Sequence, residues 1–237
     1  MRARRRPTLS TRTLSMRSEQ PFVTWSLVTV NVVVYLISIS RPGGTVNSPS
    51  FFFLTKWALI GPAVANGDWW RLITAAFLHA SLLHLGLNML GLVWLGAPVE
   101  RYLGHVPYLA LYLVAGLAGS AGALVTTPVG LTVGASGAIF GILGAMLIIE
   151  YQATGQLAGQ AFTLIVINLL FSFTVNGISI GGHIGGLIGG IAAALALTRF
   201  GRTSLAYGRP GLVGVAALIG VGVLSVLVSY WKVKGYA

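Results

Sequence analysis

Residues 181–190 read GGHIGGLIGG and lie within an apolar run at 180–198. On a helix, residues four apart lie on one face, so the glycines of this stretch form two adjacent ridges. The ridges are, in turn, Gly182, Gly186 and Gly190, and Gly181, Gly185 and Gly189. Ridges of small residues let helix backbones approach closely in lipid. The stretch therefore predicts a membrane helix in tight contact with its neighbours, with His183 inside that contact.

The residue best suited to partner His183 is a serine in another apolar run, at 133–150. An imidazole inside a membrane is costly unless it has a polar partner. The run begins VGASGAIFG, so that Ser136 stands beside a short small-residue ridge formed by Gly137 and Gly141. Contact between the two runs through their glycines would bring the serine within hydrogen-bond reach of the histidine.

The composition indicates a membrane protein. Of the 237 residues, 55% are hydrophobic and only 8% are charged. Soluble domains carry about 25% charged residues, so lipid must be the main solvent of this chain. It has no cysteine, which excludes disulfides, thiolate metal sites and cysteine nucleophiles. The net charge is +11, but no basic stripe with interleaved aromatic residues suits a nucleic acid, so we expect no nucleic-acid partner.

Apolar runs of about 20 residues predict membrane-spanning helices. Such runs lie at 22–40, 81–99, 106–126, 133–150, 159–176, 180–198 and 211–230. The segment 41–80 is rich in Phe and Trp but interrupted by Pro and Gly, so we expect interfacial or re-entrant structure there. The loops between the later runs are short. The chain is therefore predicted to be an all-α polytopic membrane protein whose function belongs to the membrane core.

Loop charges predict the orientation. With the N-terminus inside, ten basic residues face the inner side and five the outer side, so the N-terminus is expected in the cytoplasm and the C-terminus outside. Residues 1–21 then form a basic, disordered cytoplasmic tail, although their Arg-rich and Ser-rich composition is also typical of a mitochondrial transit peptide. Two locations stay open: a bacterial-type plasma membrane and, as the alternative, the mitochondrial inner membrane.

This orientation places four polar side chains in one layer below the outer surface. Ser136 and His183 each lie about one turn, or about 5 Å, inside the outer end of their helix. His84 shares their level in the run at 81–99, and Asn88 follows one turn deeper on the same face. No Asp or Glu lies at this depth, so packing alone is expected to hold the ring of the histidine.

Three motifs together resemble the rhomboid intramembrane serine proteases: GASG at 134–137, GHIGG at 182–186 and HASLLHLGLN at 79–88. The resemblance covers about residues 22–198 and implies a six-helix rhomboid core bundle. The remaining 199–237 would hold a linker, one extra C-terminal transmembrane helix and a short outer tail, which is similar to the "6+1" arrangement of some members.

The resemblance implies roles for individual residues. Ser136 would be the nucleophile and His183 the base, and the oxyanion hole would consist of His84, Asn88 and the backbone N–H of the serine. We expect the other motif residues to support this site. They are Gly134, Gly137, Gly182 and Gly186 in the two glycine motifs, Phe140 under the histidine ring, Trp70 and Arg71 in the first loop, and His79, which would hydrogen-bond in the turn before residue 81. No metal and no cofactor is expected.

The implied function is an endopeptidase that cleaves transmembrane segments of membrane proteins near their outer end. A lipid-buried helix has no free backbone groups, so its substrate would have to unwind locally. One alternative is a catalytically silent rhomboid-like scaffold that binds transmembrane clients. Another is a small transporter or channel, which would need ionisable residues across the bilayer, yet the inner half of the spans has none. The expected partners are transmembrane substrates and the lipid bilayer, and the sequence does not set the oligomeric state.

Overall fold

The computed structural model describes residues 20–198 and 211–236, and these ranges contain helices and loops but no β-strand. The tail predicted at 1–21, except for its last two residues, and most of the predicted linker lie outside the described residues. Six helices are long and apolar enough to cross a membrane. They are α1 (Phe22–Ile39), the continuous stretch Leu82–Leu103, α7 (His105–Thr126), α8 (Ser136–Thr154), α10 (Ile180–Thr198) and α11 (Leu212–Val233). The predicted all-α polytopic fold is confirmed.

The second of these spans changes its helical type in the middle. It comprises α5 (Leu82–Gly91), a π-helical turn η2 (Leu92–Gly96) and α6 (Ala97–Leu103). Pro98 lies in the first turn of α6. Because proline has no N–H and its ring collides with the carbonyl four residues earlier, the wider turn lets the helix continue past it. The span therefore reaches four residues beyond the predicted end at 99.

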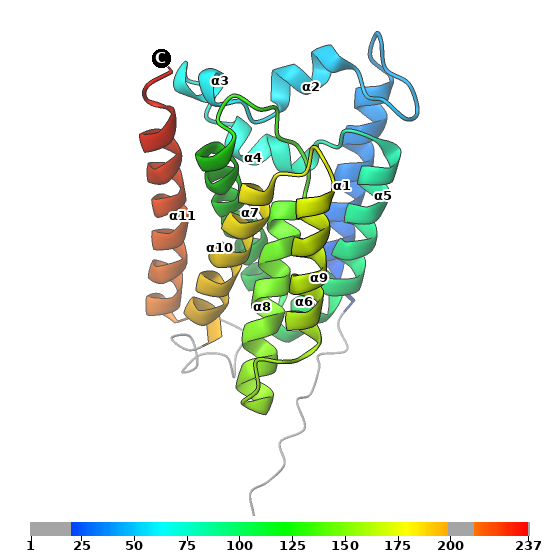
Figure 1. The fold of residues 1–237 in the computed structure, drawn as a ribbon. Helices are drawn as coiled ribbons and strands as arrows, with labels where there is room; N and C mark the ends of the chain where they lie inside the picture. Colours follow the sequence, from blue (N-terminus) through cyan, green and yellow to red (C-terminus); the bar gives the residue numbers. More distant parts are fainter. Residues whose placement is uncertain (1–19, 199–210, 237) are drawn as a thin grey trace, which may run out of the picture.

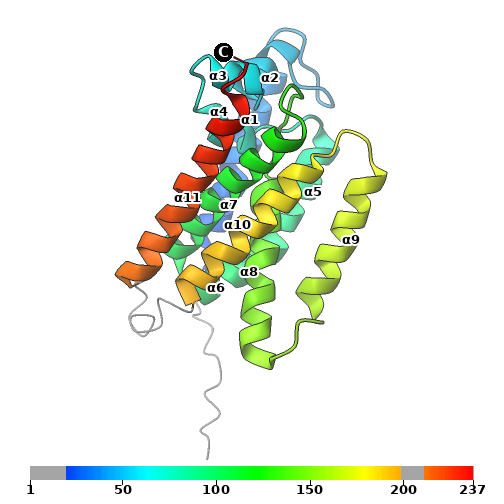
Figure 2. The same ribbon diagram turned by 60° about the vertical axis from the view of Figure 1, so that its left-hand side comes forward.

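The helix α9 (Gln160–Thr174) is shorter than the span predicted at 159–176. Its 15 residues rise about 22 Å, against a hydrocarbon core of about 30 Å. Only Ala161, Ile165 and Ser172 of this helix are buried, and they lie on one face. In Figure 2, α9 stands at the edge of the bundle with α8 and α10 beside it.

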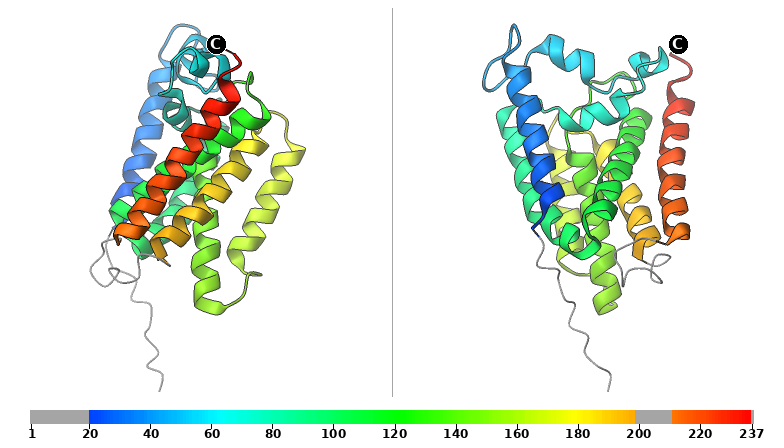
Figure 3. Two further views of the ribbon diagram at one scale, coloured as in Figure 1. Left: turned by 90° about the vertical axis from the view of Figure 1, so that its left-hand side faces the viewer. Right: turned by 180° about the vertical axis from the view of Figure 1, so that it is seen from behind.

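Four short helices within the interrupted segment 41–80 form a cap over one end of the bundle (Figures 1 and 3). They are α2 (Phe51–Trp57), α3 (Gly61–Ala65), α4 (Arg71–Thr74) and η1 (Ala75–Phe77). Arg71 holds this cap together, because its Nη1 donates to the carbonyl oxygens of Thr55 at 2.7 Å and Ala58 at 2.8 Å. Its Nε also pairs with the Asp68 carboxylate at 2.9 Å. The neighbouring Trp70 is exposed on the surface.

The centre of the bundle consists of α7, α8 and α10, which touch through small residues. A Cβ atom at Gly186 or Gly190 would collide with the backbone of Gly137 or Gly141 in α8. The other ridge faces α7, where a Cβ at Gly185 would collide with the Ala118 carbonyl. The two glycine ridges thus pack on two different helices, and the contact of α10 with α8 is the one that the sequence predicts.

Contrary to the sequence prediction, α8 begins at Ser136 rather than near 133. Two features delay the helix: Thr132 is held extended by a bridge to Leu59, and Gly134 has a φ of 126°. Figures 1 and 2 show α8 displaced along the bundle, starting below the level at which α7 ends and projecting beyond its neighbours at the far side. The serine therefore lies inside the bundle although it is the first residue of its helix.

A buried carboxylate accepts hydrogen bonds from the start of α1 at the opposite end of the bundle. The side chain of Glu100 accepts the backbone N–H groups of Val23 at 2.8 Å and Thr24 at 2.7 Å, and the Thr24 hydroxyl at 2.6 Å. His105 Nδ1 lies 2.5 Å from the same carboxylate. These donors include N–H groups of the first turn of α1, which have no acceptor within the helix. α1 begins at this end and α11 finishes beside the cap, so the described chain ends lie on opposite sides (Figure 3).

Candidate active site

Ser136 and His183 meet between α8 and α10. The serine is the first residue of α8, and the histidine lies in the first turn of α10. His183 Nε2 lies 2.8 Å from Ser136 Oγ, which is hydrogen-bond distance. The histidine is buried, whereas the serine is half-buried. The glycine contact between the two helices sets this distance.

The ring of His183 rests on Phe140. The two rings are stacked, with centroids 4.1 Å apart and planes inclined by 19°. Phe140 lies four residues after Ser136, on the same face of α8. One rigid helix therefore carries both the hydroxyl and the surface that supports the imidazole, in the arrangement that the sequence resemblance implies.

The other nitrogen of the imidazole contacts a residue that sequence reasoning missed. His183 Nδ1 lies 2.7 Å from the hydroxyl oxygen of Ser172 in α9. Within residues 20–198 and 211–236, no carboxylate hydrogen-bonds to His183. The signal that could have found Ser172 is its place in an apolar helix, on the same face as Ala161 and Ile165.

His84 lies directly beside the loop that leads to Ser136. A Cβ atom built on Gly134 would lie 2.8 Å from both Cε1 and Nε2 of His84 and 3.8 Å from Ser136 Oγ. His84 Nδ1 accepts the backbone N–H of Ala80 at 3.4 Å, and the Cε1–Nε2 edge of the ring lies against Gly134. The structure thus brings His84 into the layer that contains Ser136 and His183, as predicted.

Asn88 is less closely joined to this group. It lies one turn after His84 in α5, and its Nδ2 donates to the His84 carbonyl oxygen at 2.8 Å. Its Oδ1 is buried and has no hydrogen-bond partner among the residues described. The amide has a second N–H that this bond does not use. The predicted pairing of Asn88 with His84 on one helix face is present, but no direct bond joins Asn88 to Ser136.

The start of α8 offers a further donor. The first N–H groups of an α-helix have no acceptor within it, and the helix dipole places partial positive charge there. Because Ser136 is the first residue of this 19-residue helix, its own backbone N–H belongs to that set. A negative oxygen formed beside Ser136 Oγ would meet this N–H and the edge of His84.

The prediction that His79 stabilises a turn by hydrogen bonding is wrong. Its side chain is buried, and in the described part of the chain neither ring nitrogen has a hydrogen-bond partner. It packs edge-on against His84 instead, with centroids 5.1 Å apart and an interplanar angle of 66°. Burial, together with the neighbouring His84, lowers the pKa of His79 to about 3, so the ring is neutral. The turn is closed by Ser81, whose Oγ accepts the His84 N–H at 3.1 Å.

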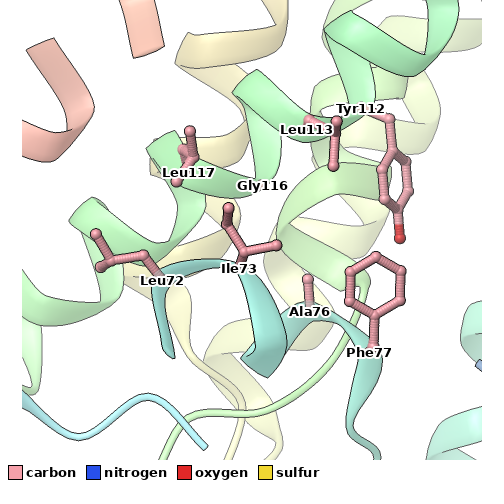
Figure 4. Close-up of a pocket in the computed structure, with 8 residues that line it drawn as sticks. All are labelled: Leu72, Ile73, Ala76, Phe77, Tyr112, Leu113, Gly116 and Leu117. Carbon is pink, nitrogen blue, oxygen red and sulfur yellow. The ribbon is translucent and has the colours of Figure 1, made fainter. Parts of the chain in front are cut away.

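A small crevice lies elsewhere, between α7 and the stretch formed by α4 and η1 (Figure 4). Its walls are almost wholly apolar, and none of the candidate catalytic residues lines it. The described residues contain no group of three or more His, Cys, Asp or Glu side chains arranged to hold a metal.

Comparison with known proteins identifies the family of the chain. A family model described as Rhomboid domain matches residues 66–200. The chain belongs to the rhomboid family. The matched range contains every candidate residue of the rhomboid site, from the first-loop Trp70 to Gly186 of α10, and it excludes both α1 and α11.

Several curated relatives bear rhomboid names. Rhomboid protease GluP of Bacillus subtilis is 35% identical over 182 residues, which are 75% of this chain and 35% of that protein. RHOMBOID-like protein 5 of Arabidopsis thaliana is 39% identical over 120 residues, 46% of this chain and 38% of the relative. RHOMBOID-like protein 6, mitochondrial, of the same plant is 39% identical over 84 residues, 35% and 27% of the two chains. The chain spans about a third of the length of these relatives.

Proposed function

We propose that this rhomboid-family protein is an intramembrane serine endopeptidase, with Ser136 as nucleophile and His183 as general base. The observation that carries the proposal is the 2.8 Å approach of His183 Nε2 to Ser136 Oγ at the start of α8. A hydroxyl is a weak nucleophile until an adjacent base takes its proton, and this pair has the geometry for that transfer. The name of the relative GluP, a rhomboid protease, supports the same reaction class.

The reaction follows from the positions of the two side chains. Neutral His183 accepts the Ser136 proton on Nε2 as Oγ attacks the carbonyl carbon of a peptide bond. The same nitrogen then returns the proton to the departing amine, and the C–N bond breaks to leave an ester on the serine. Water, deprotonated by His183 in turn, hydrolyses this ester and releases the second product. The first proton transfer runs along the 2.8 Å contact between the two side chains, and His183 Nε2 finally returns the proton taken from water to Ser136 Oγ as the ester bond breaks.

The negative oxygen of the tetrahedral intermediates would be held by three donors. These are the backbone N–H of Ser136, the ring of His84 and the amide of Asn88. Support comes from the free N–H at the start of α8 and from the approach of the His84 ring to Gly134. Loss of one such donor costs about 2.7–4 kcal/mol of transition-state stabilisation.

The proposed substrates are transmembrane segments of other membrane proteins, cut near the end that lies beside the cap. Ser136 sits at the cap-side end of α8, so a segment that unwinds there would expose a peptide bond to it. We propose that the cap faces the outside and that the N-terminus is cytoplasmic in a bacterial-type plasma membrane. The alternative is a mitochondrial inner membrane, and one relative has "mitochondrial" in its name. Residues 22–198 would form the proteolytic core and α11 the extra helix.

Labelling by a fluorophosphonate serine probe tests the proposal on the purified protein in detergent. We expect wild type to be labelled and both Ser136→Ala and His183→Ala to be unlabelled. Ser225→Ala is the matched control, because Ser225 is a buried serine of the membrane helix α11, which contains neither Ser136 nor His183. Equal labelling of wild type and Ser136→Ala would overturn the assignment of the nucleophile. A folded wild type that resists the probe would favour the scaffold that binds transmembrane clients.

A further inference from the structure

Ser172 connects α9 to the candidate dyad. Its side chain is buried, and its Oγ has two close neighbours. One is His183 Nδ1 at 2.7 Å, and the other is the backbone carbonyl oxygen of Asn168 at 2.6 Å. Both distances are within hydrogen-bond range for a hydroxyl. The direction of each bond follows from the hydrogens that these groups have.

A serine hydroxyl carries one hydrogen, whereas a carbonyl oxygen carries none and only accepts. The 2.6 Å contact with Asn168 would set two bare oxygens against each other unless the Ser172 hydrogen lies between them. The hydroxyl hydrogen is therefore committed to Asn168. Ser172 Oγ consequently turns a lone pair to His183, and the imidazole must supply the hydrogen from Nδ1.

A neutral imidazole carries one N–H, so a proton on Nδ1 leaves Nε2 bare. Nε2 then accepts the hydroxyl hydrogen of Ser136 across their 2.8 Å contact. The three hydrogen bonds therefore share one direction: Ser136 donates to His183, His183 donates to Ser172, and Ser172 donates to the Asn168 carbonyl. In the opposite tautomer an N–H would face Ser136, and the ring could not take its proton.

We propose that Ser172 is a positioning residue that holds His183 in the Nδ1–H tautomer, the form that can act as a base toward Ser136. This inference rests on the proposed protease function. The bond also strengthens when the imidazole gains a proton, because hydrogen bonds from a charged donor are stronger than neutral ones. Ser172 thus fulfils, with a neutral hydroxyl, the orienting task that a carboxylate performs in Ser-His-Asp proteases.

The position of α9 decides whether this bond forms. Ser172 lies on the buried face of a helix that buries only two other side chains, Ala161 and Ile165. Those apolar contacts dock α9 against α8, and Ser172 adds a polar contact with α10 near the cap side. The tautomer of His183 therefore depends on α9 being docked.

A spectroscopic experiment tests the tautomer without any need for activity. The full-length protein is labelled with ¹⁵N-histidine, and the His183 signals are identified by their loss in His183→Ala. In wild type we expect Nδ1 to show the shift of a protonated nitrogen and Nε2 that of an unprotonated one. In Ser172→Ala we expect both nitrogens to move toward an average of the two tautomers. Unchanged His183 shifts in folded Ser172→Ala would overturn the inference.

Kinetics with a transmembrane reporter substrate give the second readout. Removal of one neutral hydrogen bond is expected to lower kcat about fivefold to tenfold in Ser172→Ala with KM unchanged. Ser172→Thr keeps the hydroxyl and should retain most of kcat. Ser225→Ala is the control, because Ser225 makes the same kind of bond to a helix carbonyl, to Val221 at 2.8 Å, far from the site. Should Ser172→Ala not fold, Ser172→Cys preserves its volume and leaves only a weak acceptor.

The two readouts separate the two proposals. If no sample, wild type included, cleaves the reporter or takes up the serine probe while the tautomer still shifts in Ser172→Ala, the protease proposal fails, and Ser172 sets the His183 tautomer without a catalytic task. If wild type is active and Ser172→Ala matches it in both tautomer and kcat, Ser172 has no positioning role and the dyad stands. A lower kcat with an unchanged tautomer would also count against the inference.

Discussion

The ring of Phe140 lies nearly parallel to the ring of His183, with centroids 4.1 Å apart. This contact covers one face of the imidazole, while Ser136 and Ser172 bind its two nitrogens. Orientation of the His183 ring thus depends on one aromatic surface and two hydroxyls. When the imidazole takes up a proton, the negative face of the aromatic ring also attracts the new charge.

Replacement of Phe140 separates this attraction from simple packing. Phe140→Leu keeps an apolar side chain but removes the aromatic face, and we expect kcat to fall about threefold to fivefold. Phe140→Ala should show at least the same loss and, in addition, lower the free energy of unfolding by about 3 kcal/mol because of the cavity that it leaves. The measurement is kcat per active site, with active sites counted by probe labelling. A wild-type kcat in Phe140→Leu would show that packing alone matters.

Gly134 is a position of the site where only glycine fits without strain. Its φ of 126° is strained for any residue with a Cβ, and that Cβ would lie 2.8 Å from two atoms of the His84 ring. In Gly134→Ala we expect His84 to be displaced and kcat/KM to fall about 100-fold or more, as for the loss of an oxyanion donor. The value is measured by reporter cleavage at matched amounts of folded protein.

Gly86→Ala is the control for that change. Gly86 lies in α5 two residues after His84, and a Cβ there would meet no atom within 4 Å. Alanine is also a better helix former than glycine, so stability should be unchanged or slightly higher. If Gly134→Ala were as active as Gly86→Ala, the close approach of His84 to the loop would have no part in the chemistry.

Much of the site was predictable because membrane helices contain few polar residues, and each of them is costly in lipid unless it has a polar partner. Ser136, His183 and His84 stood out in apolar runs, and the glycine ridges identified which helices touch. The depth of these side chains below the outer surface could be counted from the predicted helix ends, because an α-helix rises by a constant distance per residue. The packing of α10 on α7 and α8 follows the same pattern in the structure.

What could not be predicted depends on groups distant in sequence. The delayed start of α8 follows from the pairing of Thr132 with Leu59, which lies more than 70 residues earlier. The contact of Ser172 with His183 depends on where α9 docks, and a serine that bonds its own helix carbonyl looks the same in sequence whether or not it has a second partner. His79 lacks the expected bond because the Ser81 side chain already caps the turn.

At the far end of the bundle, Glu100 provides a test of stability without a change in the site. Its carboxylate accepts two backbone N–H groups and one hydroxyl from α1. In Glu100→Gln an amide NH₂ replaces one acceptor oxygen and faces those donors. We expect the free energy of unfolding to fall by about 2–3 kcal/mol, with kcat of the folded protein unchanged. Reversible unfolding in mixed micelles measures the first quantity, and reporter cleavage below the melting range measures the second.

Glu150→Gln is its matched control. Glu150 also accepts a helix N–H, that of Ala161 at the start of α9, which lies 3.0 Å from its Oε2. Within residues 20–198 and 211–236 it accepts a hydrogen bond from this residue alone. The expected loss is therefore about 1 kcal/mol or less. Equal losses in the two variants would show that the extra bonds of Glu100 to α1 add nothing to stability.

The neutral, buried ring of His79 predicts how stability depends on pH. Its pKa is about 3 in the folded protein, against an ordinary value of 6.5. Between these two values the unfolded chain binds a proton that the folded chain does not, so acid favours unfolding. Above pH 6.5 the neutral His79 ring adds its full share to the free energy of unfolding. Below pH 6.5 that free energy falls by up to about 1.4 kcal/mol for each pH unit.

His79→Phe removes this titration while keeping a flat ring to pack against His84. We expect the free energy of unfolding of wild type to fall more steeply than that of the variant between pH 6.5 and pH 5, with a difference in slope of about 1 kcal/mol per pH unit. At pH 8 both rings are neutral, so the difference there measures packing alone and serves as the internal control. Parallel curves across the acid range would mean that His79 gains a proton as easily in the folded protein as in the unfolded chain.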